Sequence, residues 1–190
     1  LAAGAEEYLI ITADVPWVDG PILTRFLDAA RAREHAAADL VYAVVEKATA
    51  TAAFPGQERT FVTLTDGRFT GGNAVYLKRA AIAGLLPLID DLYRARKNPF
   101  ALARLMGIDT LFRLATGTAT IAQLERRARR LLGVEARALI SADAAIAADV
   151  DRPAHVPGAG DGRLPAPPVV GGPHAPRGAS GGPHPTRRAS

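Results

Sequence analysis

The chain has 190 residues, no cysteine and a formal net charge of +4 at pH 7. The lack of cysteine excludes a disulfide framework and a thiolate metal site, and no run of about 18 apolar residues predicts a membrane span. No secretory signal is visible at the start, so we expect a cytoplasmic protein.

The composition changes near Arg152. Nine of the fourteen prolines and three of the four histidines lie beyond this point, and the ten-residue segment at 171–180 is nearly repeated at 181–190. Such a segment cannot bury enough apolar surface to offset the entropy of ordering it. We therefore predict one folded domain over residues 1–152 and a disordered tail over residues 153–190.

The excess positive charge also lies in this tail. Residues 152–190 hold five arginines and one aspartate, whereas the rest of the chain has eighteen basic and eighteen acidic residues. The body of the protein is therefore not predicted to bind nucleic acid.

The first half of the body reads as strand, helix and strand. Residues 8–13 form a continuous apolar run, typical of a strand buried on both faces. Asp19 and Pro21 predict the start of a helix that continues to about Glu34, and residues 39–45 predict a second strand. The spacing is sufficient for a crossover that pairs the two strands in parallel.

The second half begins with irregular chain at 46–58, followed by a strand at 60–64, a hairpin turn at Asp66-Gly67 and short strands at 68–70 and 74–77. Residues 80–132 read as several helices, of which the last covers 121–132 and ends at Gly133. Strands are expected at 135–140 and 146–150. This order fits an α/β sandwich with a mixed sheet.

Asp14 follows the first apolar run and precedes Pro16. A carboxylate at the carboxyl end of a strand is where open α/β sheets place their ligand chemistry. Magnesium takes only one or two protein carboxylates, so Asp14 is a candidate metal ligand. An ordinary turn residue is the alternative, because Asp is common in turns.

Asp149 and Asp151 form a second acidic cluster. They are two residues apart, so in an extended chain both would point to the same face. We interpret them as candidate metal ligands that meet Asp14; a solvated acidic end is the alternative.

Gly71-Gly72-Asn73 interrupts a strand, and glycine permits close approach of the backbone to a ligand. A β-bulge with a turn-forming Asn is the alternative. Lys97 lies in Arg96-Lys97-Asn98-Pro99, a candidate phosphate contact at a helix junction, although most basic residues nearby are expected on solvated helix faces. With one histidine in the body, no Ser/His/Asp triad or histidine metal pair can be assembled.

The segments 9–16, 69–73 and 148–153, in this order, resemble the MobA-like nucleoside-triphosphate transferases. This resemblance implies a Rossmann-like mixed sheet with helices on both faces, of the nucleotide-diphospho-sugar transferase type. It also implies transfer of a nucleoside monophosphate from a nucleoside triphosphate to an unknown small-molecule acceptor, with Mg²⁺ as cofactor. Asp14 and Asp151 would be catalytic metal ligands, with Asp149 a close rival, and Gly71, Gly72, Asn73 and Lys97 would contact substrate.

The family also opens with a strand and a Gly-rich nucleotide-binding loop, and the sequence contains no such loop. We therefore predict a partial domain that lacks its first strand and loop, is inactive alone and shows no detectable nucleotide binding. The alternatives are a noncatalytic α/β binding or regulatory module and a glycosyltransferase of the related nucleotide-sugar-binding fold. Those glycosyltransferases carry Asp-x-Asp at the strand end where this chain has only Asp14.

Overall fold

A computed structural model describes residues 4–86 and 107–150. Its centre is a five-stranded mixed sheet in which the strand order is β1-β4-β2-β5, with β3 paired to β4. The strands are β1 (Glu7–Ile11), β2 (Leu40–Glu46), β3 (Val62–Leu64), β4 (Gly67–Lys78) and β5 (Ala136–Ser141). β2 and β5 are parallel, and β4 is antiparallel to both β1 and β2.

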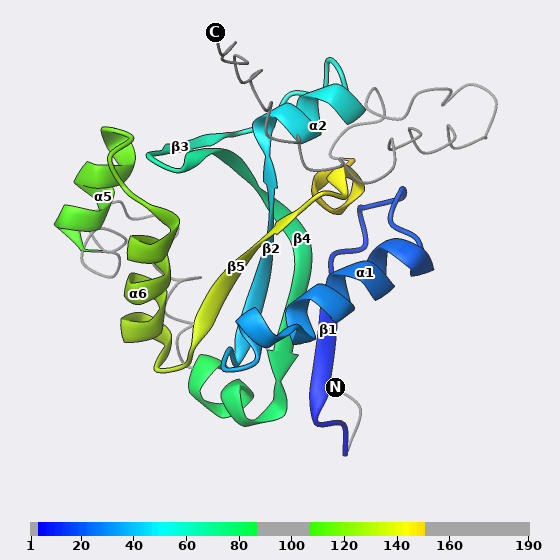
Figure 1. Ribbon diagram of the computed structural model, residues 1–190, viewed down its shortest axis with the longest axis vertical. Helices are drawn as coiled ribbons and strands as arrows, with labels where there is room; N and C mark the ends of the chain where they lie inside the picture. The colour runs from blue at the N-terminus through cyan, green and yellow to red at the C-terminus, as the bar shows by residue number, and fades with distance from the viewer. Residues whose placement is uncertain (1–3, 87–106, 151–190) are drawn as a thin grey trace, which may run out of the picture.

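Helices cover both faces of this sheet (Figure 1). The described helices are α1 (Gly20–Arg31), α2 (Lys47–Ala53), α5 (Ile108–Ala115) and α6 (Ile121–Leu132), with short 3-10 turns η1 (Arg33–His35) and η2 (Ala144–Ala147). Residues 79–86 are also helical. The predicted α/β architecture with a mixed sheet is therefore confirmed.

Successive side chains of β2 point to opposite faces of the sheet. Val41 and Ala43 are fully buried in the main core, together with Phe26 of α1 and Ile146 of η2. Residues 40, 42 and 44 point to the opposite face, beneath α6. This period of two is what places α1 and η2 on one side and α6 on the other.

Two helix boundaries follow directly from local sequence. The Asp19 carboxylate accepts a hydrogen bond from the Ile22 amide at 2.9 Å and caps α1. Thr120 and Gln123 form a capping box at the start of α6, and Gly133 ends it in a left-handed conformation. These signals are local, so the sequence predicted both starts correctly.

Several expectations were wrong. β1 and β2 are not neighbours, because β4 lies between them. β1 is not buried on both faces: Ile10 and Ile11 are 44% and 43% exposed, and among the described strands β1 pairs only with β4. The stretch expected to be irregular contains α2, and the strand expected at 146–150 is absent: η2 covers residues 146 and 147, and residues 148–150 form neither helix nor strand.

The hairpin is confirmed, with Leu64 opposite Gly67. Its second strand is longer than expected, since the two short strands and the interruption between them form the single strand β4. Lys97, Asp151 and the whole of the expected tail at 153–190 lie outside the described residues. No helix in the described part of the chain is long and apolar enough to cross a bilayer.

Candidate functional site

A polar cavity of about 720 Å³ lies beside the middle of β4. Its wall includes the predicted Gly71, Gly72, Asn73 and Asp149. The remaining lining residues are Tyr42, Glu58, Arg59, Thr60, Val62 and Thr70. A cavity of this size falls within the usual range for a small-molecule site.

The wall contains a bulge in β4. Tyr42 of β2 pairs with Val75, and Val44 pairs with Gly71, so residues 72–74 of β4 lie opposite the single residue Ala43. The expected interruption at Gly71-Gly72-Asn73 is therefore a bulge within a continuous strand. Bulges bend a strand and re-aim its side chains, and they are common beside active sites.

Neighbouring side chains leave no room for a Cβ atom at Gly71 or Gly72. A Cβ on Gly72 would lie 2.8 Å from Ile146 Cγ2 and 2.9 Å from Ala43 Cβ. A Cβ on Gly71 would overlap the hydroxyl of Tyr42, whose partial burial raises the pKa of this phenol. Gly72 is thus required for packing between β4 and η2, and Gly71 makes room for a neutral hydroxyl at the cavity wall.

The backbone brings the two acidic segments together. The Val150 amide donates to the Asp14 carbonyl oxygen at 2.9 Å, and the Thr12 amide donates to the Asn73 carbonyl oxygen at 3.2 Å. Asp14 is exposed and follows β1 by three residues. The segments that carry Asp14, Asn73 and Asp149 are therefore neighbours in space, although 135 residues separate the two aspartates along the chain.

Asp149 is held by side chains that the sequence analysis did not single out. Arg59 Nη2 donates to Asp149 Oδ1 at 3.1 Å, and Gln57 Nε2 donates to the Asp149 backbone oxygen at 2.7 Å. The Arg59 side chain is only 6% exposed, whereas that of Asp149 is 35% exposed. No local pattern predicts this pair, because its members are 90 residues apart.

The supporting elements are rigidly packed. Trp17, three residues after Asp14, is 6% exposed, and its ring lies 5.2 Å from that of Phe54. Arg25 of α1 forms two hydrogen bonds, at 3.0 and 2.6 Å, with Asp143, the residue before η2. These contacts fix the turn after β1 and the segment leading to Asp149 on the same side of the sheet.

Asp14 and Asp149 are the candidate ligands for a hard cation. Within residues 4–86 and 107–150 there is no group of three or more acidic or histidine side chains that could hold a metal ion. Magnesium needs only one or two protein carboxylates and takes its other ligands from water and phosphate. Asp14 and Asp149 are the carboxylates of these two neighbouring segments; Arg59 already donates to Oδ1 of Asp149, and Asp14 is not among the described residues that line the cavity.

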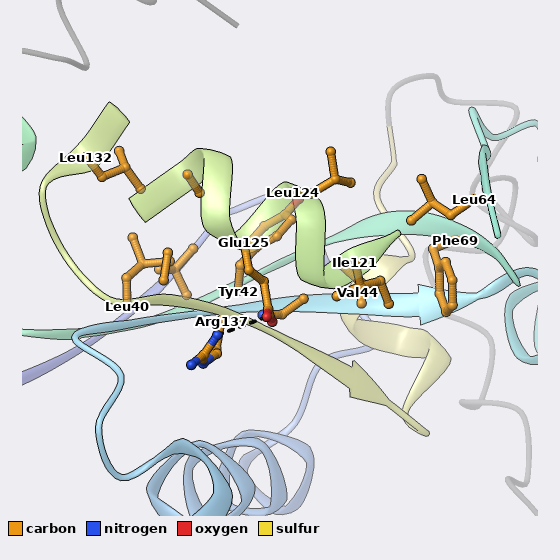
Figure 2. A pocket seen from close by; sticks show the side chains of 14 residues that line it. Leu40, Tyr42, Val44, Leu64, Phe69, Ile121, Leu124, Glu125, Leu132 and Arg137 are labelled. Atoms are coloured by element: carbon orange, nitrogen blue, oxygen red, sulfur yellow. Dashed lines mark hydrogen bonds and ion pairs between the residues drawn. The ribbon is translucent and has the colours of Figure 1, made fainter. Parts of the chain in front are cut away.

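A second cavity, of about 450 Å³, lies between α6 and the sheet (Figure 2). Leucine, isoleucine, valine and aromatic side chains point into it, and an ion pair in its wall joins Glu125 to Arg137 at 3.1 Å. Glu125 also accepts the Ala138 amide at 2.9 Å. Among the described lining residues these two charged side chains are therefore already paired with each other and with the backbone.

This chain is similar to a solved structure, a "hypothetical transferase" from Thermus thermophilus. The two are 40% identical with a TM-score of 0.72, over 79% of this chain and 63% of the other. The chain therefore shares the mixed α/β fold of that neighbour. It spans less than two thirds of the length of that neighbour. No protein-family model and no curated protein matches it.

Proposed function

We propose that this chain carries the metal- and acceptor-binding part of a magnesium-dependent nucleotidyltransferase. The observation that supports this most is the hydrogen bond between Val150 and Asp14, which brings the Asp149 segment beside the turn after β1. The similarity to a hypothetical transferase supports group transfer in general. Transfer of a nucleotide is the more specific part of the proposal.

In the proposed reaction an acceptor oxygen forms a bond to the α-phosphorus of a nucleoside triphosphate. The bond from this phosphorus to the bridging oxygen breaks, pyrophosphate leaves and the acceptor proton passes to solvent. Bound magnesium supplies charge neutralisation for the phosphates. Asp14 and Asp149 would hold the ion, and Asp151 and Lys97 are further candidate contacts.

The cavity supplies the acceptor contacts in this proposal. Asn73 can both donate and accept hydrogen bonds, and the bulge places it on the cavity wall with Gly71 and Gly72. Arg59 holds Asp149 in place from below the surface. Because the sequence has no Gly-rich nucleotide loop, this chain is assigned the metal and the acceptor, and triphosphate binding is not assigned to it.

Binding of Mn²⁺ in place of Mg²⁺ tests the proposal, with the fluorescence of Trp17 as the readout. Trp17 is the only tryptophan and lies close to Asp14 in the chain. We expect saturable binding that weakens about tenfold or more in both Asp14→Asn and Asp149→Asn, since each removes one charged ligand. Asp28→Asn, an exposed carboxylate on α1, is the matched control and should bind as the wild type does.

Three results would contradict the proposal. Absence of saturable Mn²⁺ binding in the wild type would favour a noncatalytic module, in which the Arg59–Asp149 pair is purely structural. Equal binding by the wild type and both site variants would place the ion elsewhere. Release of a nucleoside diphosphate from a nucleotide sugar, detected by phosphorus NMR, would favour the glycosyltransferase alternative.

A further inference from the structure

A third cavity, of about 360 Å³, lies between α5 and α6. Its walls are the first turn of α5 and one side of α6. Among its described lining residues, none is shared with the cavity that contains Asp149. It is therefore a separate feature of the molecule.

Arginine dominates this cavity. The guanidinium-bearing residues Arg113, Arg126, Arg127 and Arg130 line it, and Asp109 is the one acidic residue among the described lining residues. By contrast, residues 1–151 taken together have eighteen basic and eighteen acidic residues. Three of the four arginines of α6 line this cavity, and Arg126 and Arg130 are also exposed to solvent.

The nearby acidic side chains of Asp109 and Glu135 already form ion pairs. Asp109 pairs with Arg113 at 3.1 Å, and Glu135 pairs with Arg129 at 2.8 Å, on the part of α6 outside the cavity. Among the described residues, Arg126 and Arg130 form no hydrogen bond or ion pair. Within residues 4–86 and 107–150, the guanidinium charges of Arg126 and Arg130 are therefore not paired with an acidic side chain.

Close packing keeps these charges together. A Cβ on Gly107 would lie 3.2 Å from Nη2 of Arg127, so this guanidinium is held against the loop that leads into α5. Gathering like charges around a small volume costs free energy in the empty state, and a bound anion reverses the sign of that interaction. Guanidinium groups match the geometry of phosphate oxygens and bind them in a bidentate manner.

We propose that this arginine cavity binds a compact anion that carries phosphate groups, and that it does so without a divalent ion. The volume is that of a small-molecule site. The positive end of the α5 helix dipole at its first turn adds to the attraction. The site is independent of the proposed transferase chemistry at Asp14 and Asp149, because it contains neither carboxylate.

The test uses inorganic pyrophosphate as the probe and the full chain in the presence of a chelator, which removes any contribution from a metal-dependent site. Binding is followed by NMR of the arginine Nε–Hε groups and of the backbone amides of α5 and α6. We expect saturable shifts at these groups. In the double variant Arg126→Gln, Arg130→Gln the dissociation constant should rise about tenfold or more, because each charged hydrogen bond lost weakens binding.

Arg129→Gln is the matched control, since Arg129 lies on the same helix but pairs with Glu135 outside the cavity. Its dissociation constant should stay within about twofold of the wild type, as expected for a change in distant surface charge alone. The substituted arginines at 126 and 130 are exposed, so both variants should give the amide spectrum of a folded protein.

Three results would overturn the proposal. The first is no saturable shift up to about 10 mM pyrophosphate, beyond the range of a specific small-molecule site. The second is an equal loss of affinity in Arg129→Gln, which would indicate attraction to general surface charge. The third is binding of an RNA oligonucleotide without binding of pyrophosphate, which would indicate an open basic surface rather than a cavity for a compact anion.

Discussion

The adjacent glycines Gly71 and Gly72 should respond very differently to alanine. In Gly72→Ala the new methyl group would lie 2.8 Å from Ile146 Cγ2 and 3.0 Å from the Ala43 backbone oxygen. Ile146 and Ala43 are both fully buried, so neither neighbour can move away cheaply. Overpacking of this kind costs about 1–3 kcal/mol, which corresponds to a fall in Tm of about 3–9 °C for a domain of this size.

In Gly71→Ala the new methyl group meets only the hydroxyl end of Tyr42. Tyr42 is 38% exposed, so its ring can rotate into solvent. The loss of stability should therefore stay below about 1 kcal/mol, since the rearrangement resembles a single rotamer change. The variant should instead narrow the cavity beside β4.

Thermal unfolding followed by circular dichroism checks this difference. Gly84→Ala is a useful control, because Gly84 is in a helical segment and its nearest neighbour would be 3.7 Å from the new Cβ. That variant should be stabilised by about 0.5–1 kcal/mol through the higher helix propensity of alanine. An unchanged Tm for Gly72→Ala would refute the account of how β4 and η2 pack.

Other predictions concern pH and helix capping. Burial and a 2.7 Å hydrogen bond to Glu7 raise the pKa of Tyr76 from 10.0 to about 12. The protonated hydroxyl of Tyr76 should therefore stabilise the fold fully below pH 10, and this contribution should be lost as the pH rises towards 12;. Tyr76→Phe should lower the free energy of unfolding by about 1 kcal/mol at pH 7. In urea unfolding this variant should also lose less stability between pH 10 and pH 12 than the wild type does; an equal loss in both proteins would contradict the prediction. Hydrogen bonds from Tyr76 and Arg31 lower the pKa of Glu7 below 4.5. The ionised Glu7 therefore loses its stabilising effect as the pH falls below 4.5, and Glu7→Gln should lose less stability over that range than the wild type does;. Thr120→Ala should cost about 1 kcal/mol by removing the N-cap of α6, and an unchanged urea midpoint would show that the capping box is not formed in solution.

The sequence predicted best those features that depend on neighbours in the chain. The Asp19 cap, the α6 boundaries and the hairpin between β3 and β4 all follow from residues within a few positions of one another. Side-chain hydrogen bonds and turn conformations act over that range. A sequence pattern can therefore specify them without knowledge of the rest of the fold.

Features that depend on distant neighbours were less predictable. The apolar run at β1 indicated a strand, but its sequence could not show that β4 would lie between β1 and β2. The alanine-rich run at η2 is short and buried, and short apolar runs do not distinguish strand from helix;. Arg59 joins the candidate site through its ion pair with Asp149, 90 residues away.

The central claim is that Asp14 and Asp149 hold one divalent ion close to Asn73. Paramagnetic broadening by substoichiometric Mn²⁺ in an amide NMR spectrum tests this most directly, because the effect falls steeply with distance from the ion. The account predicts that the resonances of Asp14, Asn73 and Asp149 broaden together at the lowest Mn²⁺ level while that of Asp28 stays sharp, and that Asp14→Asn abolishes the pattern. Broadening at Asp14 without Asp149, or equal broadening at Asp28, would contradict it.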